Sequence, residues 1–189
     1  LNATDQVNVE GLLNKNGTSS VGGTTFNIAA AADWNPATAG SADLTGNGVT
    51  VSNVQTPTIT SSTYDASTGS LVVTGTNLVA ASGAANDITA NKFTLTGEGG
   101  ATHTLTNTAN VEISSGTGFT LTLSATDKAA INQMLNKNGT STTGGTTYNL
   151  AVADDWNTVI GNTSIADATG NGITTSNVAV PAITSSTYD

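Results

Sequence analysis

Residues 123–157 read LSATDKAAINQMLNKNGTSTTGGTTYNLAVADDWN, and residues 1–35 read LNATDQVNVEGLLNKNGTSSVGGTTFNIAAAADWN. Most paired positions are identical, and most of the differences keep their chemical class. A second match joins PTITSSTYD at 57–65 to PAITSSTYD at 181–189. Self-similarity at a long, fixed period is typical of a tandem array. The sequence therefore predicts repeated units of about 122–124 residues.

The two matches set the expected boundaries of the units. One complete unit runs from about Pro57 to Val180, residues 1–56 are the C-terminal part of a preceding unit, and residues 181–189 start the next. The copies differ in length by two residues between Trp156 and Gly170, which predicts a surface loop there. Half a unit leaves an apolar face uncovered, so we expect a partner segment from the parent protein or a neighbouring chain to cover it.

The composition excludes several classes of function. The chain has 13 acidic residues against 4 basic ones and a net charge of −9, so we expect no nucleic-acid partner. No stretch of about eighteen apolar residues is present, and we expect no membrane insertion. The chain has no Cys, which rules out disulfides and thiol chemistry.

Alternation of apolar and polar residues, with Gly-rich turns between the runs, predicts about seven or eight short strands in the complete unit. The expected strands cover 58–64, 71–74, 92–96, 101–105, 111–113, 119–123, 146–152 and 173–180.

One short amphipathic helix is expected between these strands. Ile131, Met134 and Leu135 recur at helical spacing after a capping residue, Ser124 or Thr126, and Gly139 is the expected stop. The predicted fold class is therefore all-β: an antiparallel β-sandwich with one short inserted α-helix.

Two motifs carry a resemblance to a known family. PTITSSTYDASTGSLVVTGTNL at 57–78 resembles the opening of bacterial Ig-like repeats of the IPT/TIG kind. YNLAVADDWN at 148–157 and the D-x-x-G-N turn at 167–171 resemble the closing strands of SwmB-like repeats. The resemblance implies an Ig-like fold in tandem repeats of large bacterial surface adhesins or extracellular structural proteins. The inserted helix departs from the plain Ig-like pattern.

Four residues are candidate calcium ligands. Asp155, Asp167 and Asn171 lie in predicted loops at one end of the sandwich, and Asp65 lies just after the junction between units. Calcium takes six to eight oxygen ligands from carboxylates, amides and carbonyls, and at a junction it would stiffen an array. The alternative is that Asp and Asn cap local amides in turns. No EF-hand spacing supports the metal.

Trp156 distinguishes two functional hypotheses. If it is exposed beside a polar groove, it would form a platform for glycans. If it is buried it belongs to the core, which the scarcity of aromatic residues favours. His103 is the one histidine and is expected at the surface. No catalytic triad can be assembled from this inventory, so we expect no enzyme.

The leading hypothesis is a non-enzymatic structural or adhesive repeat of a large secreted or cell-surface bacterial protein, forming a stalk, fibre or matrix array. The expected partners are neighbouring repeats of the same chain and other copies in a fibre. The alternative is a glycan-binding adhesin module that uses loop residues and Trp156. Both hypotheses imply an extracellular or cell-surface location.

Overall fold

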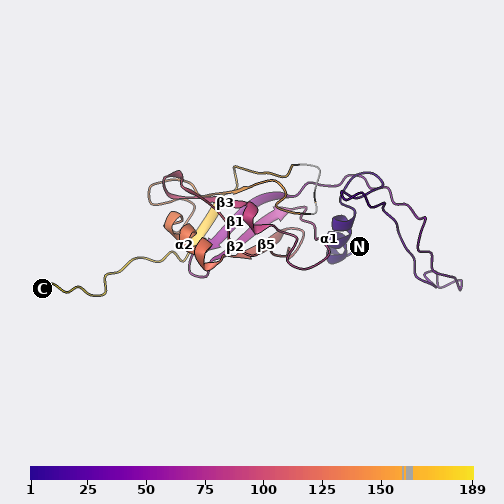
Figure 1. Ribbon diagram of the computed structural model, residues 1–189, viewed down its shortest axis with the longest axis horizontal. Coiled ribbons are helices and arrows are strands. Elements are labelled where there is room, and N and C mark those ends of the chain that lie inside the picture. The colour runs from indigo at the N-terminus through magenta and orange to yellow at the C-terminus, as the bar shows by residue number, and fades with distance from the viewer. Residues whose placement is uncertain (159, 161–163) are drawn as a thin grey trace.

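The computed structural model describes residues 1–158, 160 and 164–189. It contains seven strands in two sheets and two short helices, an arrangement compatible with a β-sandwich (Figure 1). The strands are β1 (Thr58–Asp65), β2 (Ser70–Thr76), β3 (Phe93–Thr96), β4 (Thr102–Thr104), β5 (Gly118–Thr122), β6 (Asn149–Val152) and β7 (Ile173–Ser176). The α-helices are α1 (Ala3–Leu12) and α2 (Ala125–Met134), and the 3-10 helices are η1 (Ala90–Lys92) and η2 (Glu98–Gly100).

Both sheets belong to residues 57–180, which we call the two-sheet unit. One sheet has the order β5-β2-β1-β7 and the other the order β4-β3-β6. All neighbouring strands are antiparallel except β1 and β7, which pair in parallel from Ser62 opposite Ile173 to Asp65 opposite Ser176. The expected antiparallel arrangement is therefore wrong for this pair.

The parallel pair arises because the chain changes sheet just before β7. Asp167 and Gly172 form bridges with Val152 and Asn149 of β6, in the three-stranded sheet. The next residues then pair with β1, in the four-stranded sheet. This step brings the last strand beside the first and closes one side of the unit.

Aromatic rings fill the space between the sheets. Phe93 meets Phe119 edge to face at 5.7 Å between ring centroids, and it meets Trp156 at 6.0 Å. Trp156 is buried, and its Nε1 donates to the carbonyl of Ile165 at 2.9 Å. The core position expected for Trp156 is therefore confirmed.

Helix α2 begins where the sequence predicts and ends earlier. The Ser124 hydroxyl accepts the Asp127 N–H at 3.1 Å as the N-cap. The helix ends at Met134, with Leu135 as its C-cap. Gly139, the expected stop, has φ of 109° and exchanges backbone hydrogen bonds with Thr175. Its left-handed backbone therefore serves contact with β7 rather than the helix end.

Residues 111–113, an expected strand, form a single bridge within the described residues, between Val111 and Ile88. The Ile113 N–H donates at 3.0 Å to the Asp87 carboxylate, which replaces a strand partner. The expected surface loop between Trp156 and Gly170 includes residues 159 and 161–163, which lie outside the described residues. Within the described part of the chain, both α-helices are too short to cross a bilayer.

Residues 1–56, which we call the N-terminal segment, repeat local pairings of the two-sheet unit. Bridges at Gly17–Val51 and Asn27–Gly48 match those at Gly139–Thr175 and Asn149–Gly172. The segment has no counterparts of β1 to β5 among its described residues. As a result, Trp34 is 67% exposed, whereas its counterpart Trp156 is 1% exposed.

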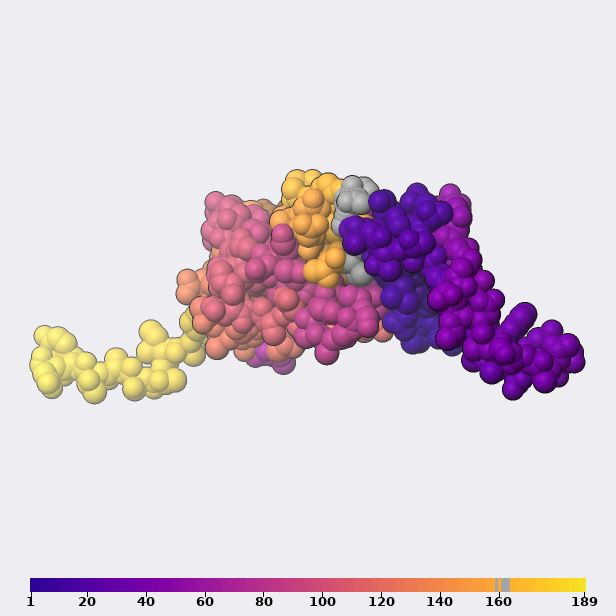
Figure 2. Space-filling view, turned by 45° about the vertical axis from the view of Figure 1, so that its right-hand side comes forward, coloured from indigo at the N-terminus to yellow at the C-terminus, as the bar shows by residue number. Residues whose placement is uncertain are grey.

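Helix α1 joins the N-terminal segment to the two-sheet unit through Gly11. A Cβ at this position would lie 1.8 Å from the carbonyl oxygen of Ala80, so only glycine fits without moving the helix. At the other end, residues 181–189, coloured yellow, project from the body of the molecule as an extended C-terminal tail (Figure 2).

The two tryptophans provide a matched stability test. Trp156→Ala removes a ring packed between the sheets, and we expect a loss of about 3–5 kcal/mol in the free energy of unfolding. Trp34→Ala removes an exposed ring, and we expect a change within about 0.5 kcal/mol. Urea denaturation of the 189-residue chain, followed by far-UV circular dichroism, measures both. Equal losses in the two variants would contradict the assignment of Trp156 to the core.

Candidate functional site

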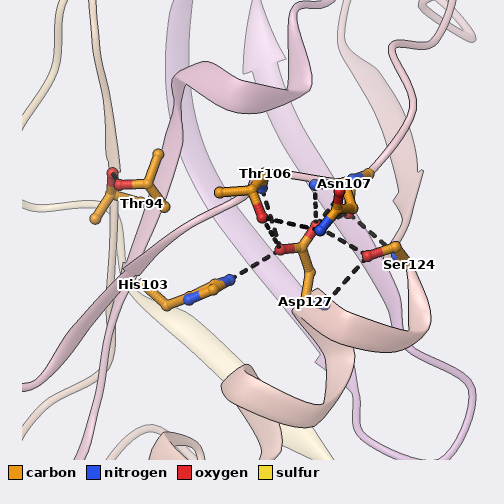
Figure 3. Close-up of polar contacts among 8 residues, drawn as sticks. Thr94, His103, Thr106, Asn107, Ser124 and Asp127 are labelled. Atoms are coloured by element: carbon orange, nitrogen blue, oxygen red, sulfur yellow. Dashed lines mark hydrogen bonds and ion pairs between the residues drawn. The ribbon is translucent and has the colours of Figure 1, made fainter.

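Among the described residues, the side-chain group with the most hydrogen bonds is the carboxylate of Asp127, in the first turn of α2 (Figure 3). Its Oδ1 accepts from His103 Nε2 at 2.9 Å and from the N–H and hydroxyl of Thr106 at 3.1 and 3.2 Å. Its Oδ2 accepts from the N–H groups of Asn107 and Thr108 at 3.0 and 2.8 Å. The hydroxyls of Thr108 and Ser124 complete the set at 2.7 and 3.1 Å.

These hydrogen bonds fix the charge state of Asp127. Burial of the side chain opposes ionisation, but the hydrogen bonds from His103, Thr108 and the loop amides outweigh it and hold the pKa below its ordinary value. An ionised carboxylate only accepts, so His103 Nε2 donates to it. His103, expected at the surface, has a side chain that is 23% exposed and joins β4 to α2 through this bond.

The hydrogen bonds of the Asp127 carboxylate give it a structural role. Both Asp127 oxygens are enclosed and each accepts several hydrogen bonds, so no lone pair is left open to a substrate or a cation. The carboxylate instead anchors the loop after β4 to the start of α2. No role was predicted for Asp127, although two signals were present: its match to Asp5 and its position three residues after the capping serine.

Asp65, one of the predicted calcium ligands, lies at the end of β1 and is already used as an acceptor. Its Oδ1 accepts from the Ser67 hydroxyl at 2.7 Å and from two turn amides, and its Oδ2 accepts from Asn177 Nδ2 at 2.8 Å. Hydrogen bonds from Ser67 and Asn177 lower the pKa of Asp65 to about 2. The side chain therefore closes a turn and joins β1 to the residue after β7.

The other three predicted ligands lie elsewhere. Asp167 pairs through its backbone with Val152, at the end of β6, and Asp155 follows that strand a few residues on. The Asn171 carbonyl accepts from the Leu150 N–H at 2.8 Å. These residues therefore flank β6, whereas Asp65 is opposite Ser176, at the far end of β7 from Asn171.

The calcium hypothesis stays a prediction from the sequence. Within the described residues, no three Asp, Glu or His side chains form a metal-binding group. Asp155 has φ of 60° and its counterpart Asp33 has φ of 58°, a left-handed turn conformation in which Asp is enriched. This observation favours the turn interpretation for Asp155.

The glycan hypothesis assigned sugar binding to Trp156, but this residue is buried. Trp156 is enclosed by Phe93 and Phe119 and cannot offer a face to a sugar in the folded unit.

Comparisons with protein-family models, with curated proteins and with solved structures found no match for this chain.

The backbone hydrogen bonds between β1 and β7 form the second candidate feature. The Ser62 N–H donates to the Gly172 carbonyl at 3.2 Å, and the Ala66 N–H donates to the Ser176 carbonyl at 2.9 Å. The Asp65–Asn177 bond lies at the same end of the pair as Ala66. The first and last strands of the unit are thus joined along their length.

Removing the charge of Asp127 tests its anchoring role. Asp127→Asn places an amide donor against several donors, and we expect a loss of about 3 kcal/mol in the free energy of unfolding. Asp5→Asn is the matched control, because Asp5 is exposed, and we expect it to cost less than about 1 kcal/mol. Chemical denaturation measures both. A loss in Asp5→Asn as large as that in Asp127→Asn would contradict the role.

The depressed pKa of Asp127 also predicts a pH dependence. In acid the unfolded chain takes up this proton before the folded chain does, so the contribution of Asp127 to stability is present above the ordinary carboxyl value of 3.8. It is lost as the pH falls below that value. We expect the parent chain to lose stability more steeply below pH 3.8 than Asp127→Asn does. Melting temperatures measured between neutral pH and acid check this, and parallel curves would contradict it.

Proposed function

We propose that the chain is a non-enzymatic structural repeat that carries tension in a large secreted or cell-surface protein, in a stalk, fibre or matrix array. Its units are Ig-like, and its partners are the neighbouring units of the same chain. Three features support the proposal. The long stretches of the sequence recur, the most connected acidic group serves to anchor a loop, and the first and last strands are bonded in parallel.

The parallel β1–β7 pair is the observation that carries the proposal. The chain enters the two-sheet unit at β1 and leaves it after β7. Tension on the two ends therefore pulls these strands in opposite directions along their shared axis. All the hydrogen bonds between them are loaded together, instead of opening one after another. This geometry suits a unit that must stay folded under a pulling force.

The side chains beside this pair extend the same connection. Asp65 and Asn177 join the end of β1 to the residue after β7, and Ser176 Oγ donates to the Tyr64 carbonyl at 3.4 Å. Tyr64 is buried, and its hydroxyl donates to Asn132 of α2 at 2.7 Å. The pair is therefore supported from the core side by the helix.

Single-molecule pulling on the two ends of the 189-residue chain tests the proposal. Backbone groups at Gly172 and Ser176 face β1, while Thr175 faces Gly139, so the Thr174 N–H faces β1. Thr174→Pro removes that donor, and we expect the unit to unfold about a hundredfold faster at equal force.

Thr120→Pro is the matched control. Thr120 lies on the edge strand β5, and the bonds from Gly75 to Thr117 and from Leu123 to Gly69 place the Thr120 amide facing away from β2. Proline is tolerated at such an edge position. We expect an unfolding rate close to that of the parent chain. Equal acceleration in both variants, or a parent unit that opens at very low force, would overturn the proposal.

A further inference from the structure

Two connections that lead from one sheet to the other meet at Asp87. Residues 77–92 lead from β2 in the four-stranded sheet to β3 in the three-stranded sheet, and residues 105–117 lead back from β4 to β5. The connections are bridged at Ile88 and Val111, which exchange backbone hydrogen bonds at 3.0 and 3.3 Å. Asp87 directly precedes this bridge and is 1% exposed. A carboxylate is therefore enclosed at the point where the two connections join.

Asp87 and Glu112 bond reciprocally across the two connections. Asp87 Oδ2 accepts from the Ile113 N–H at 3.0 Å, and Glu112 Oε1 accepts from the Asn86 N–H at 2.8 Å. Each carboxylate thus accepts from the neighbour of the other acid, and the two side chains are close enough to hydrogen-bond to each other. Asp87 Oδ1 also accepts from the Ala81 N–H at 2.5 Å, which closes the first connection into a loop.

No positive charge compensates this pair of acids. Within the described residues, neither carboxylate forms a salt bridge. Residues 79–82 and residues 156–164, which bond to the same loop, carry no charged side chain. The other charged groups on the elements around the pair are two acids of α1 and one lysine of η1: Asp5, Glu10 and Lys92. The Lys92 charge acts on Asp154, whose pKa it helps to lower.

The enclosure of Asp87 makes its ionised form costly. Burial raises the pKa of Asp87, and the N–H groups of Ile113 and Ala81 oppose this effect without cancelling it. The hydrogen bond from Glu112 and the Glu112 charge raise the pKa further. Two carboxyl groups can hydrogen-bond to each other only when one of them carries a proton. The folded unit therefore binds this proton more tightly than the unfolded chain does.

We propose that Asp87 and Glu112 form a clamp that shares one proton and locks the two sheet connections together in mildly acidic solution. At neutral pH both groups ionise, and like charges then face each other without a cation between them. The first connection is held less firmly against the second in this state. The inference concerns the two-sheet unit alone, so it stands apart from the place of that unit in an array.

The clamp has the opposite pH dependence to Asp127. Because the pKa of Asp87 is raised by folding, the shared proton stabilises the unit fully below the ordinary value of 3.8. This stabilisation is lost as the pH rises through the raised pKa. The contribution of Asp127 is instead lost as the pH falls below 3.8. We therefore expect the unit to be most stable in mild acid, above 3.8 and below neutral pH.

Melting curves of Glu112→Gln between neutral pH and mild acid test the clamp. Glu112 is exposed, so the substitution should leave the fold intact. The glutamine oxygen can still accept from the Asn86 N–H, and its amide can donate to an ionised Asp87. We expect the melting temperature at neutral pH to rise by about 2–4 °C over that of the parent chain. This advantage should disappear as the pH falls toward 3.8.

Glu10→Gln is the matched control, because Glu10 is exposed and its carboxylate accepts from Gln6 rather than facing a second acid. Its melting curve should run parallel to that of the parent chain. Carbon NMR of the Asp87 carboxyl gives a direct second readout. We expect a titration midpoint above 3.8 in the parent chain and a lower midpoint in Glu112→Gln. An Asp87 that titrates alike in both chains, or a Glu112→Gln curve parallel to the parent, overturns the proposal.

Discussion

The parallel hydrogen bonds between β1 and β7 join residues as far apart in the sequence as Ser62 and Gly172, separated by 110 positions. The rest of the unit depends on this contact. It fixes where the four-stranded sheet ends, and it requires the chain to leave the three-stranded sheet just before β7. It also places Tyr64 in the core, where its hydroxyl donates a hydrogen bond to Asn132 of α2. Desolvation raises the pKa of Tyr64 to about 12, as expected for a phenol enclosed by protein.

Two further groups hold the parts of the unit that this strand pair does not reach. The rings of Phe93, Phe119 and Trp156 bring the sheets together. The Asp127 carboxylate holds the loop after β4 against α2. A buried charge with this many donors is costly to leave unpaired, so it specifies one loop conformation. In a chain with 9% charged residues, a few such polar anchors replace wider ionic networks.

The local features of the fold could be predicted from the sequence. Period-two alternation located β1, β2, β3 and β5, and the capping serine located the start of α2. The parallel direction of β1 and β7 could not be predicted, because alternation along a strand is the same for both directions of pairing. The role of Asp127 was also missed, since its seven hydrogen bonds come mainly from a loop that has no periodic pattern. Trp34 and Trp156 share the motif Asp-Trp-Asn, yet they are 67% and 1% exposed, so the motif alone could not predict which of them is buried.

The pairing of first and last strands also bears on how the chain folds as it is synthesised. β1 leaves the ribosome long before β7, so one edge of β1 stays unpaired until almost the whole unit has emerged. In that interval, the nearest strand with the sequence character of β7 is residues 49–52 of the preceding segment. Because exchange of like elements is a characteristic error of repeat proteins, divergence between Val49–Ser52 and Ile173–Ser176 would help each first strand to select its own partner.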